Sequence, residues 1–222
     1  MIVPIYTLFI LIDIQDVKLE GRHLILRSPR SGDLEGLSDA ANDGEIWTNP
    51  FANFPNVDEM SVYLQNMIHH DASFLPFIII EKKSMRILGT TRFLAIEPNN
   101  RRVEIGHTWI AESFRRTFVN TEAKFLMLKY AFEKLNCIAV EIRTDALNKV
   151  SRKAIERLGA KQDGILRNHK IMKNGRIRNT VCYGIIKEEW PDVQENLSAK
   201  LNSYKDKLIH FSIYLMFFPF VI

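Results

Sequence analysis

The sequence has few of the residues that build covalent or metal-held frameworks. It contains two cysteines, Cys137 and Cys182, and neither has a near partner, which excludes a disulfide framework and a zinc site of paired cysteines. Its six histidines lack the His-Glu-x-x-His spacing, so we predict no metal site. This cysteine usage suits a reducing compartment, and we therefore expect a cytoplasmic protein in which both cysteines are packed side chains.

Apolar runs long enough to cross a bilayer are also missing. The most apolar segments are the two ends, residues 1–12 and 208–222, and both are shorter than a full span. The first lacks the basic start and small-residue cleavage site of a signal peptide. Packing on the domain, contact with a membrane surface and a non-native extension all remain open for these ends. We take residues 1–16 as an extension, leave 208–222 unassigned, and expect no membrane partner.

The chain carries a small excess of positive charge. The formal net charge of +4 is too mild to predict a nucleic-acid partner, although it suits an anionic cofactor. With 46% hydrophobic and 25% charged residues, the chain is typical of a soluble globular fold. We therefore expect one domain over residues 17–190, followed by a polar helix over 191–207.

The hydrophobic pattern alternates between the periods of strands and helices. It predicts strands at 23–26, 74–80, 87–96, 102–110 and 137–144, helices at 33–41, 56–71, 121–135 and 149–158, and a hairpin of 161–172 with 177–186 around Asn174-Gly175. The 149–158 helix is expected to close at Gly159. This order predicts an α+β (α/β mixed) fold around a mixed central sheet.

Two segments carry the chemistry. In the first, the strand VEIGHTWI runs through the basic turn RRTFVN into a helix, whose free N–H groups can bind phosphate beside Arg115 and Arg116. In the second, Asn148 stands at a helix entry and Ser151 follows in its first turn, with Leu158-Gly159-Ala160 at the end. A solvated loop and an ordinary helix cap are the plainer interpretations of these two segments.

Together the segments resemble the GNAT acetyltransferases, most closely the RimJ/RimL-type group, which acetylates the N-termini of ribosomal proteins among other amines. The resemblance covers about Leu19 to Trp190. It is carried by LEGRHLILRSP, EIWTNP, VEIGHTWI, NTEAKFLMLKYAFEKL, DALNKVSRKAIERLGA and GILRNHKIMKNGRIRNTVCYGIIKEEWP. It implies a twisted, mostly antiparallel sheet flanked by helices and splayed at a cofactor cleft between strands 103–110 and 137–144.

The resemblance implies acetyl-coenzyme A (acetyl-CoA) as co-substrate and assigns residues to it. The backbone near Trp109 and Ile110 and the side chain of Asn148 would bond the pantetheine arm. Ser151 would lie near the sulfur and donate a proton to the leaving thiolate. The pyrophosphate would be held by the turn residues Arg115, Arg116, Thr117 and Asn120.

Two departures from the family pattern stand out. The family turn is commonly Gln/Arg-x-x-Gly-x-Gly/Ala, whereas RRTFVN has no glycine, which leaves the path of this loop open. Many members carry a tyrosine seven positions after the asparagine, where this chain has Ile155. Ser151 is therefore the candidate proton donor, with a helix-start serine as the alternative.

The acceptor side is less well defined. Glu104, on the cleft strand, is the candidate base that takes a proton from the attacking amine, most simply through water, unless it is an ordinary strand glutamate. His107 is next, but strict strand alternation places it on the opposite face from Glu104. By the resemblance Trp47 lines the acceptor side, although a core tryptophan is the alternative.

These expectations describe an N-acetyltransferase in which an amine attacks acetyl-CoA directly. The acceptor is the α-amine of a protein N-terminus or a small-molecule amine, and a homodimer remains open. A catalytically weak acetyl-CoA sensor is the alternative, suggested by the missing glycines and tyrosine. A basic RNA-binding module built on the 167–178 hairpin is a third, although that hairpin lacks interleaved aromatic residues.

Overall fold

The computed structural model describes residues 17–71 and 73–217, with side chains as far as residue 204. Eight strands form one sheet in the order β1-β2-β3-β4-β5-β6-β8-β7. The strands are β1 Lys18–Glu20, β2 Leu24–Arg27, β3 Leu75–Glu81, β4 Ile87–Glu97, β5 Arg102–Ile110, β6 Ala139–Asp145, β7 Lys161–Ile171 and β8 Ile177–Ile186. The helices are α2 Leu34–Asn42, α3 Met60–Ile68, α4 Phe118–Lys129, α5 Lys149–Glu156 and α6 Trp190–Phe217.

The sheet is mixed and mostly antiparallel, because β5 and β6 are its only parallel neighbours among the described residues. This confirms the predicted α+β fold. The central strand β3 is buried on both faces. Its residues Phe77 and Ile79 enter one core, while Ile78 and Ile80 enter the other, which explains why the strand reads as a continuous apolar run.

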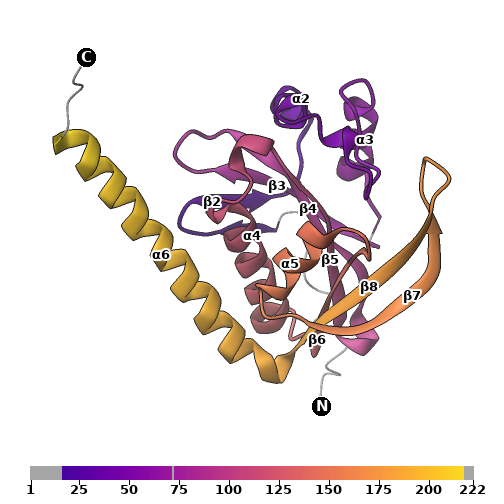
Figure 1. The fold of residues 1–222 in the computed structure, drawn as a ribbon. Coiled ribbons are helices and arrows are strands. Elements are labelled where there is room, and N and C mark those ends of the chain that lie inside the picture. Colours follow the sequence, from indigo (N-terminus) through magenta and orange to yellow (C-terminus); the bar gives the residue numbers. More distant parts are fainter. Residues whose placement is uncertain (1–16, 72, 218–222) are drawn as a thin grey trace, which may run out of the picture.

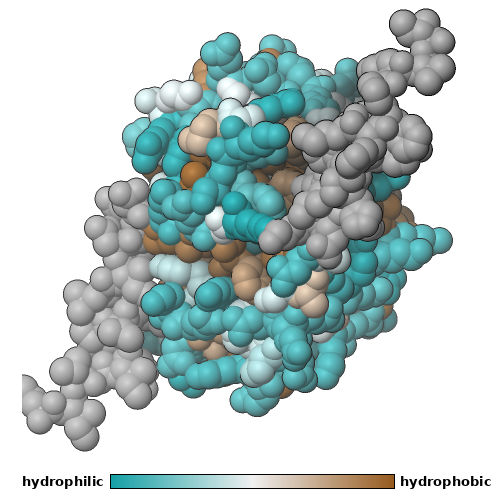
Figure 2. Space-filling model, turned by 90° about the vertical axis from the view of Figure 1, so that its left-hand side faces the viewer, coloured by the Kyte–Doolittle hydropathy of each residue, from teal (hydrophilic) through white to brown (hydrophobic). Residues whose placement is uncertain are grey.

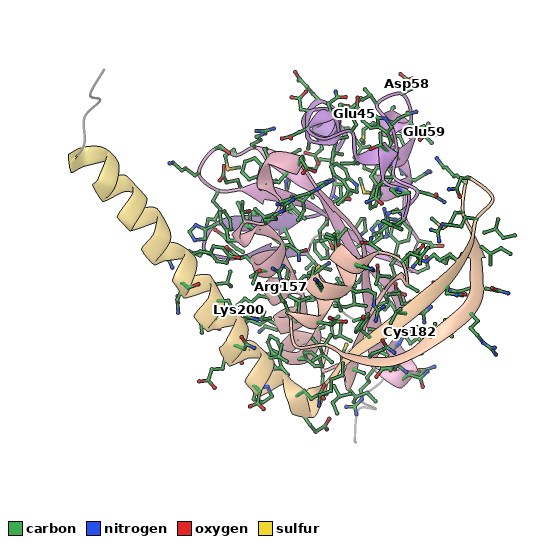
Figure 3. The ribbon with its side chains drawn as sticks, viewed as in Figure 1. Glu45, Asp58, Glu59, Arg157, Cys182 and Lys200 are labelled. Carbon is green, nitrogen blue, oxygen red and sulfur yellow. The ribbon has the colours of Figure 1, made fainter. Side chains whose placement is uncertain are left out.

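The helices cover the two faces of the sheet. Side chains of α4, α5 and α6 pack into the larger core, whereas those of α2 and α3 pack into the smaller one (Figure 1). Lys200 of α6 donates a hydrogen bond to the carbonyl of Arg157, just after α5, at 2.5 Å (Figure 3). The side of the molecule shown in Figure 2 is largely hydrophilic, with a hydrophobic band in its central recess.

Several element boundaries differ from the sequence-based prediction, most clearly in α3, α4 and α6. Helix α3 starts at Met60, since Asn56 and Glu59 instead cap a turn before it. Helix α4 starts at Phe118 rather than at residue 121, because the Thr117 hydroxyl caps it by accepting from the Val119 amide. Helix α6 continues through the predicted polar segment to Phe217.

The two ends of the chain were expected to be apolar and unassigned. The backbone of 208–217 continues helix α6, while residues 1–16 and 218–222 lie outside the described residues. Within the described part of the chain, no helix combines the length and the apolar character that crossing a membrane requires.

A β-bulge interrupts the pairing of β4 with β5. The register shifts between Thr90 and Arg92 of β4, so that Thr91 lies opposite both His107 and Thr108. One extra residue on β5 advances the side-chain alternation by one position. Thr108 therefore points toward α4, where its hydroxyl lies 2.8 Å from that of Thr91, while His107 points toward the α3 face.

Lys124 of α4 is buried beneath this bulge. Its Nζ donates to the hydroxyls of Thr108 at 2.5 Å and Thr91 at 3.3 Å. None of the ion pairs among the described side chains includes Lys124. Burial lowers the pKa of this ammonium from its ordinary 10.5 to about 7. A charged Lys124 therefore opposes folding.

Lys124→Met should change how stability depends on pH. Below pH 7 lysine is protonated in both states and its unfavourable contribution is complete. That contribution shrinks as the pH rises from about 7 to 10.5, because the unfolded chain then binds more protons than the folded one. The stability gain from methionine should therefore be larger at pH 6 than at pH 10, by on the order of 3–5 kcal/mol.

Urea unfolding of both proteins across this pH range measures the effect. Lys129→Met, at an exposed position on the same helix, is the control and should give a nearly constant difference. Parallel pH profiles for wild type and Lys124→Met would contradict the assignment of a depressed lysine pKa.

Candidate functional site

The parallel strands β5 and β6 separate soon after they meet. They pair at three positions only, from Arg102 opposite Ala139 to Glu104 opposite Glu141. The remaining residues of β5, 105–110, have no paired residue on β6. Apart from the Ile110 carbonyl, which accepts from Arg115, their backbone groups on that side have no strand partner and could pair with an extended ligand. This opening lies where the sequence predicts the cofactor cleft.

The basic turn leads from the open end of β5 into α4. Arg115 and Arg116 are both exposed, and Arg116 adopts a left-handed backbone with φ of 60°. This is the position at which a glycine would be unstrained, so the glycine-free turn is accommodated by an arginine in an uncommon conformation. Arg115 also bonds the carbonyl of Ile110 at 3.2 Å and forms an ion pair with Glu112.

Thr117 and Asn120 occupy the start of α4. The Thr117 hydroxyl donates to the Phe114 carbonyl at 2.7 Å and accepts from the Val119 amide at 3.3 Å, so it serves as the helix cap. Asn120 is half-buried in the first turn. The positive end of α4 and the two exposed arginines together form an anion-binding geometry.

Asn148 caps α5 as the sequence predicts. Its Oδ1 accepts from the amide of Ser151 at 2.9 Å, which leaves the amide nitrogen as the group that could donate to a ligand. Ser151 is half-buried in the first turn of α5. The capping interpretation of Asn148 is thus correct, and it is compatible with a second contact from the same side chain.

The bulge shows that the prediction for His107 was wrong. His107 does not face away from Glu104, because its ring contacts those of Phe54 and Tyr63, at 5.9 and 6.4 Å, on the α3 side of the sheet. Glu104 lies on that side too, because its two sequence neighbours pack into the core on the α4 side. The two candidate proton carriers therefore share one face.

The surrounding protein sets the proton affinity of both groups, although the His107 side chain is exposed. Burial raises the pKa of Glu104, against the opposing effect of Arg143, whose Nε lies 3.5 Å from the carboxylate. A raised pKa makes this carboxylate a stronger base. His107 retains an exposed edge, yet the surrounding protein and the positive charges of Arg92 and Lys170 lower its pKa to about 4. At pH 7 the imidazole is therefore neutral.

A cavity of about 570 Å³ opens on this face. Tyr63, Arg92 and His107 line it, and so do the exposed acids Asp58 and Glu59 near the start of α3 (Figure 3). The Tyr63 hydroxyl lies 3.0 Å from that of Thr90 and accepts from Arg92, so the cavity has a fixed polar wall. The sequence analysis assigned no role to Tyr63 or Arg92, although an arginine inside the largely apolar segment ILGTTRFLAIE was a signal.

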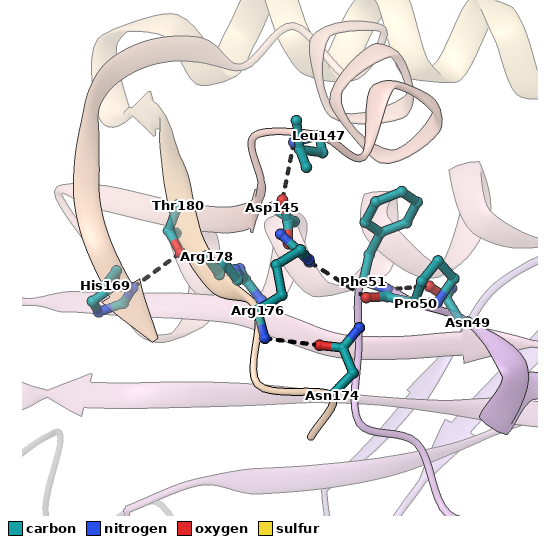
Figure 4. Close-up of polar contacts among 10 residues, drawn as sticks. All are labelled: Asn49, Pro50, Phe51, Asp145, Leu147, His169, Asn174, Arg176, Arg178 and Thr180. Carbon is teal, nitrogen blue, oxygen red and sulfur yellow. Dashed lines mark hydrogen bonds and ion pairs between the residues drawn. The ribbon is translucent and has the colours of Figure 1, made fainter. Parts of the chain in front are cut away.

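Arg176 joins the hairpin of β7 and β8 to the rest of the site. Its guanidinium bonds the buried Asp145 carboxylate, at the end of β6, at 2.5 Å. It also reaches the Pro50 carbonyl at 3.4 Å and lies over the Phe51 ring (Figure 4). Because this basic residue is already paired, it is not part of a free cationic surface for RNA.

The remaining predicted site residues lie in the cores. Trp47 is partly buried and packs with α2 and α3, close in sequence to the Pro50–Phe51 loop. The Trp109 side chain is buried on the same side, 3.4 Å from the Tyr63 hydroxyl, and Ile110 is buried on the α4 side. Only the backbone of the last two residues is therefore positioned for a ligand. The described residues contain no cluster of three or more metal-binding side chains.

Comparisons with known proteins agree with this geometry. Residues 23–161 match the acetyltransferase (GNAT) domain family. The N-acetyltransferase p20 of Bacillus licheniformis, itself uncharacterized, is 26% identical over 171 residues, covering 75% of this chain and 94% of p20. A Bacillus subtilis (strain 168) protein provisionally named ribosomal N-acetyltransferase YdaF is 36% identical over 91 residues, covering 41% of this chain and 49% of YdaF.

A solved structure shows the same architecture. The crystal structure of a GCN5-related N-acetyltransferase from Brucella melitensis superposes with a TM-score of 0.76 at 29% identity. The match covers 83% of this chain and 85% of the other.

Arg176→Met should destabilise the protein by about 3 kcal/mol, because it leaves the buried Asp145 carboxylate without its cation. The double variant Asp145→Asn/Arg176→Met should recover part of this loss, because the asparagine side chain is uncharged and needs no cation beside it. Urea unfolding measures both. Arg167→Met, at an exposed position on the same hairpin, is the control, and an equal loss for Arg167→Met and Arg176→Met would exclude a specific ion pair.

Proposed function

The chain belongs to the GNAT family of acetyltransferases, which use acetyl-CoA, and from this premise we propose that it transfers the acetyl group to an amine by direct attack in a ternary complex. The observation that carries the proposal is the separation of β5 from β6 after three paired positions. This separation would open a cleft between the basic start of α4 and the face that carries Glu104.

The cleft suits the chemical parts of acetyl-CoA. The free backbone edge of β5 around Trp109 and Ile110 can pair with the amides of the pantetheine arm. The start of α4, with Arg115 and Arg116, offers backbone N–H groups and positive charge to the pyrophosphate. Asn148, at the entry of α5 shortly after β6, would donate its amide nitrogen to the arm.

Glu104 is proposed to accept the proton of the attacking amine, directly or through water. Its carboxylate lies on the face that carries the cavity, and burial strengthens it as a base. An α-amine, with a pKa near 8, is roughly a tenth neutral at pH 7, whereas a lysine side chain is almost entirely charged. A protein N-terminus therefore needs less help from the base than a lysine does.

The acceptor class follows from the same argument. We favour an α-amine, either of a protein N-terminus or of a small molecule. The provisional name of YdaF, a ribosomal N-acetyltransferase, supports the first of these choices.

Two measurements on the purified protein test the proposal. Acetyl-CoA should raise the melting temperature, since a ligand that binds only the folded state stabilises it by about 2.7 kcal/mol at a hundredfold excess over its dissociation constant. Thiol release should then appear with members of a panel of N-terminal peptides, polyamines and amino sugars. A thermal shift without thiol release would favour the sensor alternative, for which the strained, glycine-free turn at Arg116 is the specific observation. No shift would refute cofactor binding.

Ser151→Ala should lower kcat by on the order of a hundredfold and leave the dissociation constant of acetyl-CoA nearly unchanged. A hydroxyl that donates to the leaving thiolate acts on charge that develops only in the transition state. If Ser151 is merely a helix-start residue, alanine should instead reduce stability slightly and leave kcat alone. Measuring kcat, cofactor affinity and melting temperature on this one variant separates the two roles.

A further inference from the structure

Arg92 of β4 is a buried cation with most of its hydrogen-bonding capacity unused. The residue is 9% exposed, and its guanidinium lies over the rings of Tyr63 and Phe74, at 5.6 and 5.0 Å. One of its terminal nitrogens donates to the Tyr63 hydroxyl at 2.9 Å. Its Nε is buried and has no hydrogen-bond partner among the described residues.

This arginine also lacks a counterion. No ion pair among the described side chains includes Arg92, although other arginines of the sheet, such as Arg143, are paired. A guanidinium carries five N–H donors, and a buried charge without a partner is strongly unfavourable. The two aromatic rings offset part of this. The remainder would be offset by an anion that binds with the substrate.

The cavity supplies room for such an anion. Arg92 lines it together with Tyr63 and His107, and His107 is neutral at pH 7 and adds no competing charge. Lys173 also lines the cavity, but it is exposed and pairs with Glu59 at 3.6 Å. Arg92 is therefore the buried, unpaired cation of this wall.

We propose that the acceptor amine belongs to a molecule that also carries a carboxylate, and that Arg92 binds this carboxylate in the cavity. The inference rests on the proposed acetyl transfer and narrows its acceptor. Two sources share the chemistry: a free amino acid, through its α-carboxylate, and a peptide whose first residues include an acidic side chain. Planar guanidinium and carboxylate groups match in two parallel hydrogen bonds, which gives selectivity for a carboxylate over a neutral amide.

Matched acceptor pairs test the proposal by thiol release. Amino acids are compared with their amides, and peptides beginning with Asp or Glu with those beginning with Asn or Gln. The wild type should prefer the carboxylate member of at least one series by tenfold or more in kcat/KM. The series that shows this preference identifies whether the carboxylate comes from a free amino acid or from a peptide. Arg92→Gln should abolish this preference mainly through KM, and Arg92→Lys should retain part of it. Arg22→Gln, in the exposed turn between β1 and β2, is the matched control and should behave as wild type.

A binding experiment separates this proposal from the proposed function. N-acetylglutamate and its diamide have no free amine, so their binding to wild type and Arg92→Gln can be titrated whether or not the protein turns over. Carboxylate-dependent binding that Arg92→Gln removes supports the anion site even if no amine is acetylated. Melting with acetyl-CoA reports whether each variant is folded. Equal affinity for the diacid and diamide, together with equal turnover of each acceptor pair, would overturn the proposal.

Discussion

The β-bulge at His107 and Thr108 determines which side chains of β5 face the cavity. Without the extra residue, His107 would point toward α4 and Thr108 toward α3. With it, Thr108 turns to the α4 side and receives the buried Lys124, while the imidazole joins Glu104 on the opposite face. Because Lys124 also bonds Thr91 of β4, both strands of the bulge are tied to the same helix. The position of His107 in the cavity wall thus depends on an interaction formed on the opposite face of the sheet.

The sequence specifies most of the fold because the controlling signals are local. The turn at 98–100 and the basic turn after Ile110 delimit β5, whose predicted bounds are those observed. Asn148 caps α5, and Gly159, with φ of 102°, follows its last turn as expected. The start of α4 was predicted late because residues up to 120 were assigned to the basic turn, whereas the Thr117 hydroxyl caps the helix three residues earlier than expected.

The side chains that face the cavity could not be predicted in this way. The face of His107 depends on a register shift against Thr91, a residue 16 positions away, which no periodicity in β5 reveals. Arg92 and Lys124 stand out in the sequence as charges within apolar segments. What the sequence cannot show is that one lines a cavity while the other is held by two hydroxyls. The fold was therefore more predictable than the chemistry of its site.

The outer part of the β7–β8 hairpin is held to the rest of the molecule by few contacts. Nearly all side chains of β7 are exposed, so the outer part of the hairpin has little apolar burial to hold it down. Its tip is fastened instead by Arg176, which bridges Asp145 and the Pro50 carbonyl. Regions with few buried contacts open at lower free energy than the whole molecule. Release of this guanidinium, together with the exposed Lys173–Glu59 pair, would let the tip lift as a unit while the central sheet stays intact. Amide-proton exchange in the hairpin would then be faster than exchange in β3. The first rate would report on opening of the hairpin, and the second on unfolding of the whole domain.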